Sequence, residues 1–526
     1  MEQLNKVLPD TQEEINGAAE RVETSLLEKV RSKFGFFGTI SLIFGGILAL
    51  LFYKTWIGLN VLLFTAVIVA LICIIMKRLS RKIKTWTKFY FAGAILLGIS
   101  SCLTSNAMLL FLNIIGILIL FDLILLYQFY ENGKWDFIKH FSRMVSLVFY
   151  SIASIGLPFV DGINFLRRVK ILKNDKIKNV VLGLIIAIPF LFIITFLLSE
   201  ADILFQKLTG NLFDTIFSTD IFTVTLLILL GFLFCYSVLC GVLMQSANEK
   251  IKPVKRADAA IAVTFLSVLG LVYAIFCSIQ IIYLFANGYF VLPQEFTFSE
   301  YARRGFFELL AVTVINIILM LLCNAFFKDS KPLRLLLTFI TICTYILIAS
   351  SAYRMLLYIS AYHLTFQRLF VLLLLIIDAF VLAGVIRSQF NNKFPLFQYC
   401  VAVTTICYLI FSLAKPDYYI ADDLINQKET LDIEDMRFLT EELSLDAAAK
   451  VLPVLHDEER WLAEEGQEEI LLYTENEYQD NYNINSKSHY IDKYYNKIEE
   501  ANKNTGFRAF NYSNYKAVGY ANQYPK

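Results

Sequence analysis

The apolar positions of the chain form long uninterrupted runs between residues 34 and 413, and short polar segments separate these runs. Four runs are almost free of charge over the length that a helix needs to cross about 30 Å of hydrocarbon. They lie at 34–53, 60–76, 221–244 and 369–386. Because apolar residues cover every face of such a helix, the pattern predicts a helical integral membrane protein.

Seven further runs bring the prediction to about eleven spans: 89–103, 108–127, 180–198, 260–286, 306–327, 335–351 and 397–413. The run 144–160 is also long enough to cross, and Gly156-Leu157-Pro158 interrupts it. If it crossed, the basic loop after it would face outward, so we interpret it as an interfacial or re-entrant helix. The predicted fold class is all-α, a polytopic transmembrane helical bundle.

Basic residues set the expected orientation of the bundle. The second span is followed by the densest basic stretch near a membrane end, with Lys77, Arg78, Arg81, Lys82, Lys84 and Lys88. Such loops stay in the cytoplasm. Eleven crossings then place the amino end inside and the carboxy-terminal tail outside. The first thirty residues are polar, so we expect an uncleaved first span in place of a signal peptide.

Four segments follow from this pattern: a cytoplasmic amphipathic segment 1–33, a transmembrane domain 34–414, a small acidic helical region 415–472, and a Tyr/Asn-rich segment 473–526 that reads as looser. The tail from Lys415 onward has 12 basic and 23 acidic residues, a net charge of −11. Within it, Ser444 is expected to cap a helix that stops near Pro453.

The composition supports a location in the membrane, and the sequence contains few residues in patterns typical of catalytic or metal-binding sites. The chain is 57% hydrophobic, with a mean hydropathy of +0.58. Its nine cysteines form no CxxC pair and its four histidines show no ligand spacing, so we expect neither a metal nor a cofactor. No phosphate loop or nucleophile–base motif is present. The expected partner is the lipid bilayer and not nucleic acid, and we do not expect an enzyme.

Asp378 is the most informative single side chain, because it lies at the middle of the run 369–386. A carboxylate there costs about 2.5 to 3.5 kcal/mol on insertion scales. It is either an ion or proton site, or a hydrogen-bonded structural acid. Asp122 lies near the cytoplasmic end of its span, where it can reach the interface, so we favour a structural role there.

Glu300, Arg304 and Glu308 are four residues apart and would stack along one helix face. One interpretation is a polar entrance that leads from Arg304 and Glu308 toward Asn316 and Asp378. The other is an ion pair at the end of a helix, which contributes little.

Arg354, Tyr358 and Tyr362 also recur every four residues, and Arg368 follows. They suit anchoring at the outer headgroup level. Alternatively, Arg354 and Arg368 contact an anionic headgroup or substrate.

Glu300-Tyr301-Ala302-Arg303-Arg304-Gly305-Phe306-Phe307-Glu308-Leu309 resembles the signature of a bacterial multi-pass membrane family catalogued as domain of unknown function 4173, related to 4153. Further segments agree with that family: Tyr353-Arg354-Met355 with Tyr362-His363-Leu364-Thr365, Lys415-Pro416-Asp417, and Arg508-Ala509-Phe510-Asn511. The chain differs at His363 where the family has glycine, at Lys415 where it has asparagine, and at Phe507 and Phe510 where it has tryptophan. The resemblance implies a bacterial cytoplasmic membrane and an exterior carboxy-terminal segment, but no substrate.

Two functional hypotheses follow. The first is transport or binding of a small ion or lipid-like ligand, with Glu308, Asn316 and Asp378 as path residues. The second is a sensor or scaffold whose exterior acidic tail binds a partner protein.

Overall fold

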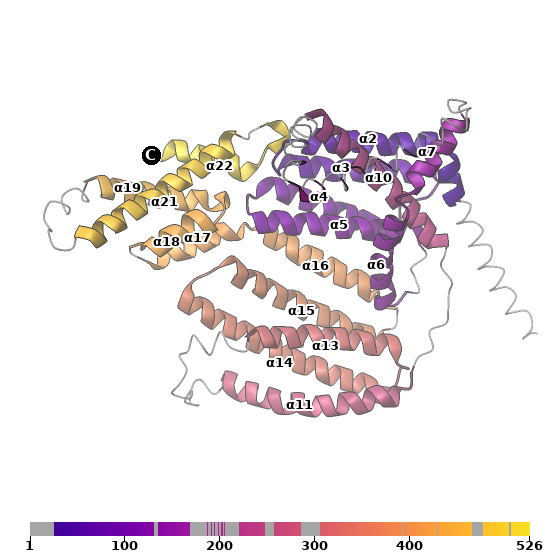
Figure 1. The fold of residues 1–526 in the computed structure, drawn as a ribbon. Coiled ribbons are helices and arrows are strands. Elements are labelled where there is room, and N and C mark those ends of the chain that lie inside the picture. Colours follow the sequence, from indigo (N-terminus) through magenta and orange to yellow (C-terminus); the bar gives the residue numbers. More distant parts are fainter. Residues whose placement is uncertain are drawn as a thin grey trace, which may run out of the picture.

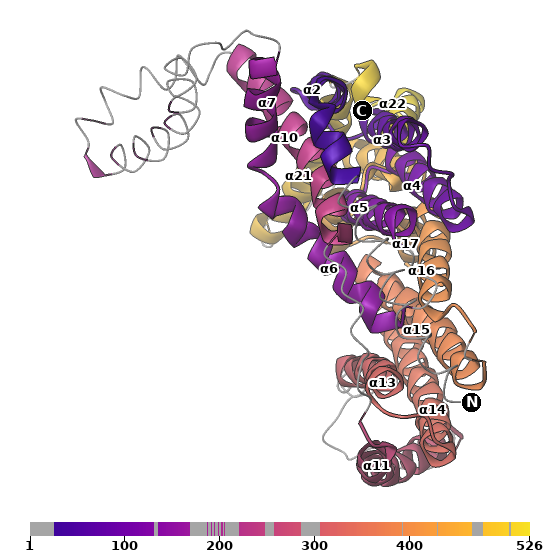
Figure 2. The same ribbon diagram turned by 90° about the vertical axis from the view of Figure 1, so that its right-hand side faces the viewer.

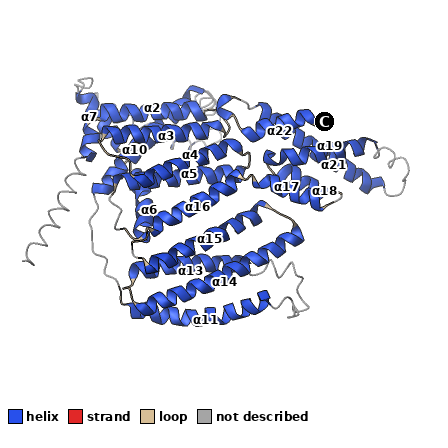
Figure 3. Ribbon diagram, turned by 180° about the vertical axis from the view of Figure 1, so that it is seen from behind, coloured by secondary structure: helices blue, strands red, loops and turns tan. Residues whose placement is uncertain are grey.

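The computed structural model describes residues 26–130, 135–168, 220–247, 257–285, 306–391, 393–428, 430–464, 477–503 and 506–526, with isolated positions between 183 and 205. Within these ranges all regular elements are helical, apart from one isolated bridge between Ala257 and Phe327 (Figure 3). Ten described helices are long and apolar enough to span a membrane. The predicted all-α polytopic bundle is confirmed. The expected span 180–198 lies mostly outside the described residues.

The bundle has two halves. The first contains α2 (Phe34–Phe52), α3 (Leu59–Arg78), α4 (Thr85–Leu103), α5 (Ala107–Phe129) and α10 (Asp220–Ala247). The second contains α11 (Ala259–Phe285), α13 (Phe306–Phe326), α14 (Lys331–Tyr362) and α15 (Phe366–Phe390). Between them, α16 (Leu396–Leu413) packs on α15 and on α4 (Figures 1 and 2).

The loops between these helices gather at two ends of the bundle (Figure 1). At one end α3 finishes at Arg78, α14 begins at Lys331 and α15 finishes near Arg387, and we call this the basic end. The tail packs against the opposite end, which we call the tail end. The start of α2 and the tail therefore lie at opposite ends of the bundle.

Helices α2 and α10 approach closely because glycines face each other at their crossing. A Cβ added to Gly45 would lie 2.2 Å from the Ile228 carbonyl oxygen, and one added to Gly231 would lie 2.6 Å from the Gly45 Cα. Small residues allow such backbone contact, and lipid-embedded helices depend on packing of this kind because lipid provides no hydrophobic drive between them.

The interrupted run 144–160 forms the bent pair α6 (Phe137–Ala153) and α7 (Leu157–Arg168), whose axes differ by 46°. The ring of His140 stacks on Phe397 at the start of α16, and the Ser154 hydroxyl lies 3.9 Å from the Met244 sulfur near the end of α10. Both contacts are at the basic end. A spanning helix would bring its two ends to opposite ends of the bundle, so this arrangement agrees with the interfacial interpretation.

One hydrogen bond and one ion pair show at which end of the bundle the chain lies before and after residues 169–219. The Arg168 guanidinium donates to the Ser32 carbonyl oxygen at 3.0 Å, at the basic end. Asp220 pairs with Lys54 at 2.5 Å, at the tail end. Arg168 and Asp220 therefore lie at opposite ends of the bundle.

The tail is one helical domain. It contains α17 (Pro416–Gln427), α18 (Ile433–Arg437), a π-helical turn (Phe438–Glu442), α19 (Ala448–Glu464), α21 (Glu477–Lys503) and α22 (Tyr512–Gln523). A single core joins them, and its fully buried members include Leu439, Val451, Leu455, Tyr494 and Ala517.

Two expectations for the tail were wrong. The segment 473–526 contributes α21 and α22 to the same core as α17–α19, so it is not a separate looser region. Helix α19 also continues through Pro453. A proline inside a helix removes one hydrogen bond, but Val451, Leu452 and Leu455 around it are all fully buried. Packing on both sides of Pro453 outweighs the lost bond.

Gly45→Ala should lower the free energy of unfolding by about 1–3 kcal/mol, because the added methyl group forces α2 and α10 apart. The matched control is Gly46→Ala, since a Cβ at Gly46 meets nothing within 4 Å. Thermal unfolding of the two variants in detergent measures the difference. Equal melting temperatures would show that the close approach contributes nothing.

Candidate functional site

A network of polar side chains joins the four helices of the second half. Asp378 on α15 lies 3.0 Å from the Thr313 hydroxyl on α13. One turn along α13, the side-chain oxygen of Asn316 accepts from the Tyr273 hydroxyl of α11 at 2.6 Å, and its amide donates to the Thr344 hydroxyl of α14 at 3.0 Å. Thr313, Asn316 and Thr344 are fully buried, whereas Asp378 is half-buried.

Two acceptors compete for the single hydroxyl hydrogen of Thr313. Its hydroxyl lies 2.8 Å from the Leu310 carbonyl oxygen and 3.0 Å from the Asp378 carboxyl oxygen. A hydroxyl has one hydrogen and so cannot donate fully to two acceptors. If Asp378 carries a proton, it donates to the Thr313 oxygen, and both bonds are then satisfied. The geometry therefore suits a group that takes up a proton.

Two of the four predicted path residues meet this network. Asn316 and Asp378 belong to it through α13. Glu308, in the first turn of α13, is exposed. At 3.6 residues per turn, it points about 140° away from Thr313 around the helix. Arg304 and Glu300 lie outside the described residues.

The predicted anion-binding pair is engaged by the protein itself. Arg354 is 8% exposed and donates to the Gln280 side chain on α11 at 3.2 Å, where Ser350 also donates at 2.6 Å. Arg368 donates to the Tyr362 carbonyl oxygen at 2.6 Å and to that of His363, and its guanidinium lies 4.2 Å from the centre of the Tyr358 ring. Arg368 thus caps the end of α14, as cations commonly do.

Asp122 stands apart from this network. It is half-buried on α5 and makes no hydrogen bond or ion pair with the described residues. A second polar cluster lies on α4, α5 and α16 instead. The fully buried Asn113 accepts from Tyr408 at 2.8 Å and from Ser412 at 3.2 Å, and Ser100 and Ser412 are 2.6 Å apart.

The tail is held to the bundle by two buried carboxylates that meet the turn between α4 and α5. Asp446 accepts from the Ser105 backbone N–H at 2.8 Å and from the Thr104 hydroxyl. Asp417 accepts from the Asn106 amide at 2.8 Å and from the Ser444 backbone N–H at 3.0 Å. Burial raises the pKa of the Asp417 carboxyl, although these hydrogen bonds oppose the shift.

The last helix reinforces this junction. Asn511 caps α22 and donates to the Thr104 carbonyl oxygen at 2.6 Å. The Ser513 hydroxyl donates to the Leu103 carbonyl oxygen at 2.9 Å and accepts from Lys415 at 2.7 Å. The segments that carry the family resemblance, around Asp417 and Asn511, therefore attach the tail to the membrane domain.

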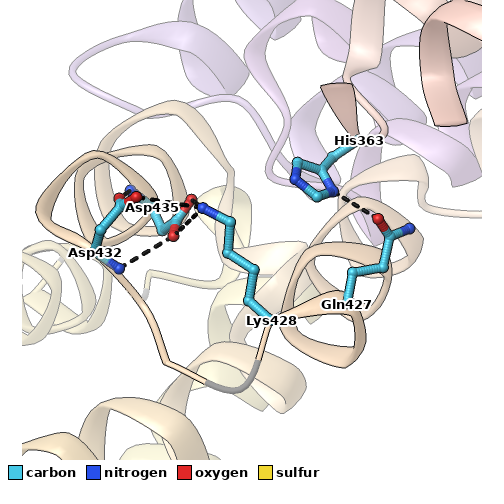
Figure 4. Close-up of polar contacts among 5 residues, drawn as sticks. All are labelled: His363, Gln427, Lys428, Asp432 and Asp435. Atoms are coloured by element: carbon cyan, nitrogen blue, oxygen red, sulfur yellow. Dashed lines mark hydrogen bonds and ion pairs between the residues drawn. The ribbon is translucent and has the colours of Figure 1, made fainter. Parts of the chain in front are cut away.

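His363 and Lys415, two positions where the chain differs from the resembled family, have positive φ. His363 has φ 65° and ψ 171°, a region that is essentially restricted to glycine, and Lys415 has φ 56° and ψ 72° in the left-handed region that asparagine tolerates. The turn after α14 therefore contains a positive-φ residue at His363. The imidazole Nδ1 of His363 lies 2.7 Å from the Gln427 side-chain oxygen (Figure 4).

The next residue after Gln427 begins another polar cluster of the tail. Lys428 contacts Asp435 at 2.6 Å and Asp432 at 3.3 Å (Figure 4). The hydrogen bond to Asp435 raises the pKa of Lys428. Asp432 and Asp435 also form the capping box of α18. This cluster fixes the loop that follows α17.

A cavity of about 550 Å³ lies at the basic end. Its lining comes from α6 and from the second half, with Trp135 and His140 before and on α6, Asn324 and Arg334 around the α13–α14 connection, and Gln389 and Lys393 around the α15–α16 connection. No sequence-based expectation pointed to this place.

A comparison with known protein families identifies the family of this chain. A family model described as Domain of unknown function (DUF4153) matches residues 91–453. The chain belongs to this family. No curated protein and no solved structure matches it. The DUF4153 region contains the polar network, the cavity, the α4–α5 turn and both junction carboxylates, whereas Asn511 and Ser513 lie beyond it.

Sequence reasoning found Asp378 and Asn316 but missed their partners. Thr313, Tyr273 and Thr344 look ordinary in apolar spans, and only the helix packing shows which of them meet. Gln280 had a usable signal, since it is a lone amide within the apolar run 260–286. The same argument that selected Asp378 would have selected it.

Asp417→Asn should change the free energy of unfolding of this DUF4153 protein by less than about 1 kcal/mol at pH 7, because the amide oxygen still accepts from Asn106 and Ser444. Asp417→Leu should cost about 2–4 kcal/mol, since it leaves two buried donors without an acceptor. The control is Asp422→Asn, which breaks a half-exposed pair with Lys450.

Because the folded pKa of Asp417 is raised, its contribution to stability should increase as the pH falls through that pKa, and Asp417→Asn should remove this dependence. Thermal unfolding as a function of pH measures both effects.

His363→Gly should raise the free energy of unfolding by about 1 kcal/mol, because glycine adopts the positive φ without strain. His363→Ala is the matched control, since it loses the same imidazole contact but keeps the strained backbone. Denaturant or thermal unfolding in detergent compares the two. If alanine and glycine variants unfold together, the backbone at His363 carries no strain.

Proposed function

We propose that this integral membrane protein binds and moves a small ion, foremost a proton, with Asp378 as the binding group. The single observation that carries the proposal is the shared Thr313 hydroxyl, whose competing bonds are resolved when Asp378 is protonated. Intramembrane acids are costly, and proton relays are one of their established uses.

The rest of the network suits this role. Asn316 and its partners link α11, α13 and α14 around the same stretch of α13 that contacts Asp378. A change in the charge of Asp378 would therefore act on the contacts among all four helices. Arg304 and Glu308 stay candidates for the entrance to the path. A lipid-like ligand is the alternative cargo.

We further propose that the basic end faces the bacterial cytoplasm and the tail lies outside, in the orientation of the domain of unknown function 4173 family that the sequence also resembles. The support is the basic character of the loops at one end. Binding or transport is proposed over catalysis because the sequence has no nucleophile–base motif.

Asp378→Asn should abolish proton uptake into proteoliposomes driven by a membrane potential, because an amide cannot release a proton. Its amide can still donate to the Thr313 oxygen, so the variant should melt within a few degrees of the wild type. Asp122→Asn is the matched control and should retain uptake. Unchanged flux in Asp378→Asn, with the protein folded, would contradict the proposal.

The second candidate is a sensor or scaffold whose tail binds a partner protein. It is favoured by the buried hydrogen bonds of the junction, through which Asp417 and Asp446 would couple a movement of the tail to the α4–α5 turn. Deleting 473–526 would break the tail core, so a photo-crosslinking residue at Tyr515, which is 63% exposed, is the sharper probe. A single discrete adduct in intact cells would support this role.

A further inference from the structure

The turn that precedes α22 lies across the ends of two membrane-spanning helices, at the tail end of the bundle (Figure 1). The Arg508 guanidinium donates to the Leu50 carbonyl oxygen, two residues before the end of α2. The Leu59 backbone N–H, at the start of α3, donates to the Phe510 carbonyl oxygen at 2.9 Å. Residues 507–510 are therefore bonded directly to both helices.

The backbone of this turn also touches the loop between α2 and α3. A Cβ added to Gly58 would lie 2.6 Å from the Phe510 carbonyl oxygen and 2.7 Å from that of Ala509. A side chain at Gly58 would therefore clash with the turn, and glycine permits the contact. Together with the hydrogen bond from Asn511 to Thr104, these contacts fix the height of the turn relative to the spans.

The lengths of α2 and α3 show how deep the turn lies. These helices have 19 and 20 residues, which corresponds to roughly 28–30 Å at about 1.5 Å per residue. The hydrocarbon core of a bilayer is about 30 Å thick. Because neither helix has residues to spare, Leu50 lies within about 3 Å of the hydrocarbon boundary. The turn bonded to Leu50 therefore lies at the level of the lipid headgroups and not in bulk water.

Large apolar side chains around this turn are exposed. Phe507 is 76% exposed, and it precedes the Arg508 that binds Leu50, which is itself 64% exposed. Trp56, in the loop between α2 and α3, is 70% exposed. Because Leu50 belongs to the outer surface of a membrane-spanning helix, this apolar surface continues from α2 onto the tail. Aromatic side chains are favoured at headgroup level, where their rings meet the ends of the hydrocarbon region.

Charge distinguishes this part of the tail from the rest. Residues 415–500 contain 8 basic and 23 acidic residues, whereas residues 501–526 contain four basic residues and no acidic one. Two of the four pair with carboxylates, but Arg508 and Lys516 make no ion pair with the described residues. Lipid phosphates attract basic side chains and repel carboxylates. The last segment of the tail therefore suits a phospholipid surface, and the acidic remainder suits water.

From these observations we infer that the turn 506–510, together with Lys516 of α22, binds the phospholipid headgroup layer on the tail side of the membrane. Phe507 and Trp56 lie where the headgroups meet the acyl chains, and Arg508 and Lys516 lie among the phosphates. The tail is thus attached to the bilayer as well as to the helical bundle. The direct continuation of the outer surface of α2 favours lipid over a partner protein. The inference goes beyond the proposed function and does not depend on an ion at Asp378.

Phe507→Trp in the full-length protein, reconstituted in phosphatidylcholine nanodiscs, tests this placement by fluorescence. The signal of the wild-type protein, which has four tryptophans, is subtracted. Phosphatidylcholine brominated on its acyl chains should quench the added fluorescence by about half or more, because an aromatic ring at this depth meets the chains. Acrylamide in the water should quench it only weakly.

The matched control is Asp457→Trp, at an exposed position of α19, a helix that extends away from the bundle (Figure 1). Acrylamide should quench its added fluorescence at least about threefold more strongly than that of Phe507→Trp, and brominated lipid should hardly affect it. Both variants should melt with the wild type, since both replace exposed side chains. An equal response of the two folded variants to both quenchers would overturn the inference.

Photo-crosslinking in intact cells separates the bilayer from a partner protein. Benzoylphenylalanine in place of Phe507 keeps an aromatic side chain, and irradiation should add the mass of one phospholipid to the protein, which intact-mass spectrometry measures. Benzoylphenylalanine in place of Asp457 should capture no lipid. A discrete protein adduct from the position of Phe507, without a lipid adduct, would overturn the lipid assignment and identify this surface as a protein-docking site.

Discussion

Hydrocarbon offers no hydrogen bonds, and this constraint governs the whole bundle. A buried polar side chain in the membrane is stabilised by a hydrogen-bond partner, commonly on a neighbouring helix. Asn316, Gln280 and Asn113 have such partners in Tyr273, Ser350 and Tyr408 respectively. The polar contacts therefore set which helices pair and in what register, while glycines such as Gly45 and Gly231 set how closely they approach. The two halves and the intervening α16 follow from these local pairings.

The same constraint explains why much of the fold was predictable. A span must be a long apolar run, so the helix positions could be located from composition alone, and the charge after residues 144–160 was enough to interpret α6 and α7. The tail obeys different rules because it lies in water. Its polar composition concealed the buried stripe of Ile491, Tyr494 and Ile498 on α21, although their spacing of three and four residues is helical. Reading periodicity instead of composition would have found this helix.

The candidate sites were less predictable, for a physical reason. A lone carboxylate such as Asp378 can be recognised because its cost is high wherever it lies in the membrane. Its partner Thr313 cannot be recognised in the same way, because a threonine costs little free energy in a membrane span. Its role becomes clear only from the contact with the neighbouring helix. The cavity at the basic end was even harder to predict from the sequence. His140 and Gln389 are 249 positions apart in the sequence, and they line one cavity only because α6 packs against the second half.

The junction at the tail end has a consequence for biogenesis. Asn511 bonds to Thr104 across 407 positions, and Asp446 reaches the same turn across 342. Helix α22 thus completes a contact with a hairpin that is synthesised much earlier. A polypeptide interrupted before Asp417 would leave the donors of Ser105 and Asn106 without their carboxylates at the membrane surface. In such a fragment the α4–α5 turn would be uncovered, so these hydrogen bonds can form only after the tail has been synthesised.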